Sequence, residues 1–148
     1  MFSDEATGWG FDFGLYYPGL LIENLNAGAS IRNLGSMSEL RNEATKLPAD
    51  LRLGLAYEFQ LAEINSNITA LGGYQKYIDT DDNHFHFGAE IFYDNVIAVR
   101  GGYMTGYESK NITAGLGILW SSFNFDYAFM PFSYGLGSAH TISVKFTF

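Results

Sequence analysis

The last nine residues of the chain alternate strictly between apolar and polar side chains. The apolar positions are Ile142, Val144, Phe146 and Phe148, and the polar positions between them are Thr141, Ser143, Lys145 and Thr147. Side chains point to opposite faces at every step of a β-strand, so this period of two predicts a strand with one apolar and one polar face. Any fold of this chain must give those two faces different surroundings.

The same alternation recurs along the chain and predicts nine β-segments. They are Gly8–Tyr17, Leu20–Leu34, Asp50–Phe59, Glu63–Tyr77, His84–Tyr93, Val96–Gly106, Asn111–Trp120, Phe123–Phe132 and His140–Phe148. Most are close to the roughly nine to eleven residues that a tilted membrane-spanning strand requires. Helical periodicity extends over no long stretch, and the polar segment Ser36–Lys46 is predicted to belong to a loop. The predicted fold is all-β, an antiparallel up-and-down meander of about nine strands.

The composition is typical of β-structure with a large apolar face. Aromatic residues make up 17% and charged residues 16% of the chain, whereas soluble domains carry about 25% charged residues. No stretch approaches the roughly 18 apolar residues of a transmembrane helix, so a membrane protein of this sequence has to be a β-barrel. The net charge of −8, without a basic run, argues against nucleic acid as a partner. A soluble β-sandwich or a lipocalin-like binder is the alternative.

Short and longer connections alternate between the segments. The short ones are Tyr17–Leu20, Phe59–Leu61, Asp94–Val96 and Ser121–Ser122, and the longer ones Gly35–Ala49, Ile78–Asn83, Tyr107–Lys110 and Ser133–Ala139. Outer-membrane barrels alternate in this way, with short turns in the periplasm and longer loops outside. If the last strand runs inward, Met1 lies outside. Because single-chain bacterial barrels have an even number of strands, we expect residues 1–148 to form one segment of an incomplete barrel, with further strands and a signal peptide upstream.

Charged residues within the segments fall almost entirely on one face. The candidates for this inner face are Asp12, Arg32, Arg52, Glu58, Glu90, Arg100, Asp126 and Lys145. We expect them to form ion pairs that keep an interior polar and hold the register of the strands, because a slip of one residue moves every charge to the apolar face. Contact of individual members with a ligand or a cargo is the alternative.

Two of these pairings follow from the spacing. A three-residue turn at Asp94–Val96 pairs Tyr93 with Ile97 and places Glu90 opposite Arg100. Lys145 is predicted to lie within cross-strand reach of Asp126. The register of the fourth segment is left open, because its start is polar at consecutive positions.

The residues favour no catalytic site, metal site or cofactor. His84 and His86 share one face at a spacing that two metal ligands on a strand can adopt, but the sequence offers no evident third ligand. The serine residues have no recognisable base and orienting acid. With no cysteine in the chain, disulfides and thiol chemistry are excluded.

Several segments together resemble the C-terminal portion of the PorV/PorQ family of outer-membrane barrels. The matching stretches are Leu25–Gly35, Leu47–Phe59, His86–Tyr103, Ala114–Ile118, Phe125–Phe129 and Leu136–Phe148. The family occurs in Bacteroidetes and related bacteria and is similar in fold to FadL-type transporters. The resemblance covers nearly the whole chain and implies a fourteen-stranded barrel of which this segment supplies the last nine strands.

The resemblance also implies a non-enzymatic function in the bacterial outer membrane. PorV-type members act in type IX secretion, where they receive the C-terminal domains of cargo and pass them to a surface attachment complex. FadL-like transport of hydrophobic molecules is the alternative. The expected partners are outer-membrane lipid, secretion cargo or secretion-system proteins, and the barrel assembly machinery, since a last strand that ends on Phe148 resembles the signal which that machinery recognises.

Overall fold

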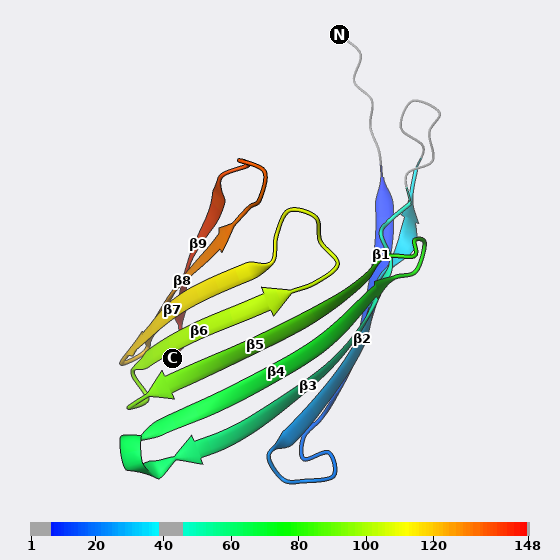
Figure 1. Ribbon diagram of the computed structural model, residues 1–148. Coiled ribbons are helices and arrows are strands. Elements are labelled where there is room, and N and C mark those ends of the chain that lie inside the picture. The colour runs from blue at the N-terminus through cyan, green and yellow to red at the C-terminus, as the bar shows by residue number, and fades with distance from the viewer. Residues whose placement is uncertain (1–6, 39–45, 148) are drawn as a thin grey trace.

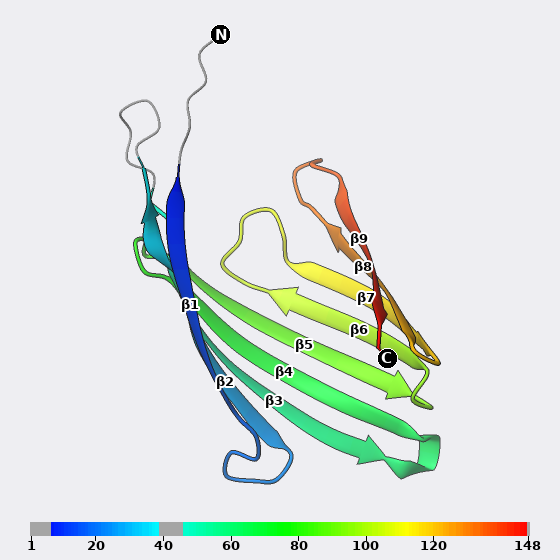
Figure 2. The same ribbon diagram turned by 180° about the vertical axis from the view of Figure 1, so that it is seen from behind.

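The computed structural model describes residues 7–38 and 46–147, which form one curved antiparallel sheet (Figures 1 and 2). Its strands are β1 (Gly8–Tyr17), β2 (Leu25–Met37), β3 (Asp50–Leu61), β4 (Ser66–Tyr77), β5 (Asn83–Tyr93), β6 (Ile97–Met104), β7 (Ile112–Trp120), β8 (Phe123–Pro131) and β9 (Ser138–Phe146). Each strand pairs with its neighbours in the chain, so the sheet runs in order from β1 to β9. The predicted all-β meander is confirmed.

Helical structure in the described ranges is limited to one short 3-10 segment, η1 (Ala62–Ile64). Within residues 7–38 and 46–147, no helix has the length and apolar character needed to cross a membrane.

The strand ends differ from the prediction where turns decide them. β2 begins at Leu25 because residues 18–24 form an irregular connection, in which the backbone N–H of Leu20 donates to the carbonyl of Leu25 at 2.6 Å. The predicted turn at Phe59–Leu61 is wrong, since these residues continue β3 and Leu61 pairs with Ser66. The chain turns instead through η1 and Asn65, whose φ of 46° is a left-handed conformation that asparagine tolerates.

The predicted loop Gly35–Ala49 is shortened at its start, because β2 continues to Met37 and Ser36 forms an isolated bridge with Lys46. Residues 39–45 of this loop lie outside the described residues, as does Phe148. The turn at Asp94–Val96 is tight, and Asp94 and Asn95 both adopt positive φ, at 51° and 53°. This backbone matches the right-handed twist of a hairpin.

The pairing registers divide the side chains between two faces. Tyr93 lies opposite Ile97, and Glu90 lies opposite Arg100. β4, whose register the sequence left open, pairs Thr69 with Glu58. Along β5 and β6, exposed side chains alternate with side chains that are buried or half-buried, so the two faces of the sheet differ in exposure. We call the more exposed, apolar set the outer face and the less exposed set, which carries the charges, the inner face.

The sheet has no ordinary hydrophobic core. In the described part of the chain the only buried apolar residue is Ala98, which is 2% exposed, whereas large apolar side chains of every strand except β2 are exposed on the outer face. The accessible surface is 11093 Å², against about 7,500 Å² for a compact soluble protein of this mass. The fold is a single layer whose apolar face requires an apolar environment.

The two edge strands each leave one edge unpaired among the described residues. β1 pairs only with β2, and β9 pairs only with β8. Figure 1 and the reverse view in Figure 2 show these strands at the two borders of the curved sheet, which does not close on itself.

The face assignment generates a prediction for arginine substitutions on adjacent strands. Val99 and Leu116 lie opposite each other on the outer face, and an arginine facing lipid near the middle of a bilayer costs roughly 2–4 kcal/mol. We expect Val99→Arg and Leu116→Arg to block assembly of the full protein, measured as the heat-modifiable folded band in the outer-membrane fraction. Thr113→Arg, on the inner face of β7, is the control and should assemble. Equal losses from both faces would contradict the assignment.

Candidate functional site

The inner face carries two groups of charged side chains, separated by a hollow. The first group, which we call the Arg100 bridge, consists of Glu90, Arg100 and Asp126. The second group, which we call the Asp50 cluster, consists of Arg32, Asp50, Arg52, Gln75, His84, His86 and Tyr107. The strands bring the cluster to the end of the sheet that carries the loops 78–82 and 105–111, because Asp50 and His84 stand at the starts of β3 and β5.

In the Arg100 bridge one guanidinium joins three strands. Arg100 on β6 donates through Nε to Glu90 Oε2 on β5 and through Nη1 to Asp126 Oδ1 on β8. It spans β7, where Gly115 and Gly117 have no side chains to obstruct it. All three side chains are partly buried. Charge-assisted hydrogen bonds of this kind are among the stronger ones in proteins, so the bridge fixes the relative register of β5 to β8.

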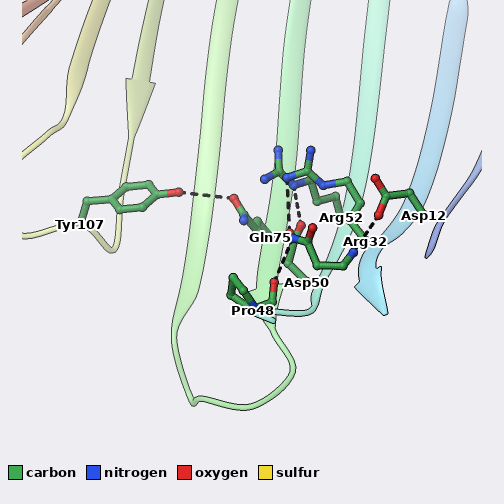
Figure 3. Close-up of polar contacts among 8 residues, drawn as sticks. Asp12, Arg32, Pro48, Asp50, Arg52, Gln75 and Tyr107 are labelled. Carbon is green, nitrogen blue, oxygen red and sulfur yellow. Dashed lines mark hydrogen bonds and ion pairs between the residues drawn. The ribbon is translucent and has the colours of Figure 1, made fainter. Parts of the chain in front are cut away.

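In the Asp50 cluster two arginine side chains bind one buried carboxylate. Asp50 is only 1% exposed. Arg52 Nε donates to its Oδ1 at 2.6 Å, and Arg32 Nη2 donates to its Oδ2 at 3.3 Å (Figure 3). Arg32 lies directly opposite Asp50 across the ladder, and Arg52 follows it on the same face of β3. One negative charge thus holds two positive charges together.

Tyr107 covers the other side of the cluster. Its ring stacks on His84 with centroids 3.8 Å apart and planes 9° apart. Its hydroxyl reaches across β5 and donates to Gln75 Oε1 at 3.3 Å (Figure 3). Burial, with the nearby Tyr77 as a smaller cause, raises the pKa of Tyr107 above its ordinary value, so the hydroxyl keeps its proton at neutral pH. Lys110 Nζ lies 4.1 Å from the centre of the same ring.

Four polar atoms of the cluster are buried without a hydrogen-bond partner among the described residues. They are Arg32 Nε, Gln75 Nε2, His84 Nδ1 and His86 Nε2. Leaving such a group unsatisfied costs about 1–3 kcal/mol. Folded proteins rarely gather several of them without a functional reason or a partner. The cluster is therefore the best candidate for a binding site.

Between the two groups the inner face is hollowed. A cavity of about 770 Å³ extends across the middle of the strands. Many of the inner positions there are occupied by small residues, among them Gly28, Gly54, Gly88, Gly102, Gly115 and Ala128. His86 of the Asp50 cluster and Arg100 of the Arg100 bridge also line this hollow.

The remaining charged residues predicted for the inner face belong to neither of the two groups. Asp12 accepts the backbone N–H of Asn33 at 2.8 Å and so caps the β-bulge between Phe11 and Phe13. Glu58 accepts a hydrogen bond from Asn26 at 3.0 Å, beside the connection between β1 and β2. Lys145 lies opposite Asn124 and is the diagonal neighbour of Asp126 on the same face of the sheet. Within residues 7–38 and 46–147, none of the three forms an ion pair.

Sequence reasoning missed Asp50, Gln75 and Tyr107. Asp50 shares the face of Arg52, two residues away, so the alternation already contained that signal. Gln75 required the register of β4, and Tyr107 lies in a loop whose path no periodicity describes. No group of three or more potential metal-binding side chains occurs within the described residues.

The Arg100 bridge generates a prediction at Gly117. A methyl group there would lie 2.7 Å from Asp126 Oδ1 and 3.0 Å from Arg100 Nη1, so Gly117→Ala must displace the pair. We expect the free energy of unfolding of the full protein in detergent, measured with urea, to fall by about 1–3 kcal/mol. Gly101→Ala is the matched control, because nothing lies within 4 Å of the added carbon. A loss as large in the control would show that the bridge is not the cause.

Comparison with known families identifies the chain. Residues 3–146 match the model of the family described as type IX secretion system membrane protein PorP/SprF. A comparison with curated proteins finds no match. The family match supports the assignment to type IX secretion that the sequence resemblance implied. It does not support the finer assignment to the PorV/PorQ type, and it does not support FadL-like transport. The chain belongs to the PorP/SprF family of type IX secretion system membrane proteins and, with its all-β sheet, is a protein of the bacterial outer membrane.

Proposed function

We propose that this protein is a non-enzymatic component of type IX secretion whose inner face receives a polypeptide, either cargo or another secretion-system protein, and holds it for export or surface attachment. The family match over residues 3–146 carries the proposal. A role of the PorV type, in which the C-terminal domain of a cargo protein is received and passed on, is the specific form that we favour.

The inner face supports a binding role. Both polar groups contribute to the lining of a hollow of about 770 Å³, and several buried polar atoms of the Asp50 cluster have no hydrogen-bond partner among the described residues. Lipid is the proposed environment of the outer face, because large apolar side chains cover it.

The protein is further proposed to form a closed barrel together with strands beyond the described sheet. The unpaired edges of β1 and β9 support this closure, since each unsatisfied backbone group in lipid costs several kcal/mol. Recognition of β9 by the barrel assembly machinery belongs to the same proposal.

A deletion strain of the native host tests the function. Loss of the gene should reduce the amount of type IX cargo in the medium and on the cell surface at least severalfold, measured by quantitative mass spectrometry, and the wild-type gene should restore it. Outer-membrane proteins exported by other routes serve as the control and should not change. Unchanged cargo secretion in the deletion strain would overturn the proposal.

A further inference from the structure

The Asp50 cluster has too many hydrogen-bond donors for its acceptors. Arg32 Nε and Gln75 Nε2 can only donate, and both are buried without a partner among the described residues. Each carboxylate oxygen of Asp50 already accepts one hydrogen bond, Oδ1 from Arg52 and Oδ2 from Arg32. What the cluster lacks is a further acceptor.

The charges of the cluster point to the same deficit. Among the side chains that define the cluster, Arg32 and Arg52 are positive, and Asp50 supplies its one carboxylate (Figure 3). The cluster is therefore net positive in a chain whose net charge is −8. An arginine pair with free donors is the arrangement that proteins use to bind carboxylates and phosphates.

The donors belong to a site that is already built. Gln75 is 3% exposed and His84 is 5% exposed, so their side chains are fixed by packing before any guest arrives. The Tyr107 ring covers His84 and is held to Gln75 by one long hydrogen bond of 3.3 Å. Displacing this ring exposes the His84 nitrogen and the Gln75 amide.

We propose that the Asp50 cluster binds a carboxylate group on an acidic segment of a polypeptide that lies in the hollow of the inner face. The inference rests on the proposed function and names the chemistry of its guest. A polypeptide is favoured over a free anion because the hollow beside the cluster is large and lined by small residues, which leaves room for an extended chain.

In the bound state the exposed parts of Arg32 and Arg52 hold the guest carboxylate, and Gln75 Nε2 donates to it. Tyr107 swings away, and the ring of His84 supplies a further donor. Gly106, the residue before Tyr107, has φ of 82°. Because glycine has no Cβ, its backbone can change conformation more freely than that of other residues, which allows Tyr107 to move.

The test measures binding to the full protein in detergent by fluorescence anisotropy. The probe is a labelled peptide with a run of glutamate residues, and the matched peptide carries glutamine at the same positions. We expect the acidic peptide to bind at least tenfold more tightly, with an affinity that falls as salt rises. Equal affinity for the two peptides would overturn the proposal.

Two variants with opposite expected effects identify the site. His84→Phe preserves the stack with Tyr107 and removes one buried nitrogen, so the protein should melt at the same or a higher temperature while acidic-peptide affinity falls about tenfold. Tyr107→Ala removes the covering ring and should strengthen binding. Unchanged affinity in both variants would show that the cluster is only structural.

The control is Lys145→Gln, which removes one positive charge from the inner face at the opposite end of the strands. It should leave the affinity within twofold of wild type, and a loss equal to that of His84→Phe would indicate non-specific electrostatic attraction.

Inorganic phosphate is the competitor in a second binding experiment. If millimolar phosphate alone displaces the peptide completely, the site binds free anions and the polypeptide assignment is wrong. Peptide binding is measured on purified protein and cargo secretion is measured in the deletion strain. Failure of the carboxylate-binding proposal can therefore be distinguished from failure of the proposed function.

Discussion

Every backbone N–H and C=O group in a single-layer sheet depends on a neighbouring strand, and this dependence governs the whole structure. From β1 to β9 each strand pairs with the next one in the chain, so the interior strands are satisfied on both sides. No second layer covers the apolar face within the described residues, where Ala98 is the only buried apolar side chain. Hydrocarbon accommodates such a face, because exposing apolar side chains to lipid carries no desolvation penalty. The backbone N–H and C=O groups are hydrogen-bonded between strands, so few polar groups are left exposed to lipid.

The inner face meets a different requirement. Its charges must be paired or solvated, and the structure does this in two ways. Arg100 connects Glu90 and Asp126 across two glycine positions of β7, so the ion pairs link three strands and span a fourth. In the Asp50 cluster, by contrast, buried donors remain without a partner in the part of the chain that the structure describes. One group therefore serves the register of the sheet, while the other retains the capacity to bind.

Sequence periodicity was a good guide to strands and faces and a poor guide to their ends. The position of Glu90 opposite Arg100 followed from counting residues through one tight turn. β3 extends to Leu61, two residues beyond the predicted strand end at Phe59, because its pairing with β4 continues and Asn65 accepts a left-handed conformation. The connection 18–24 is longer than predicted for a similar reason: its hydrogen bonds form within the turn and leave no trace in the alternation of side chains.

The amino-acid sequence by itself determined the all-β class, the order of strands and the side to which most side chains point, because a period of two is a property of the extended backbone and needs no tertiary contact. Only the tertiary structure decided which charges meet. Arg32 and Arg52 converge on Asp50, and Tyr107 returns from a loop to cover His84. Such contacts join residues from different strands and from a loop, and their geometry depends on sheet curvature, on the register of β4 and on the loop path, none of which local alternation specifies.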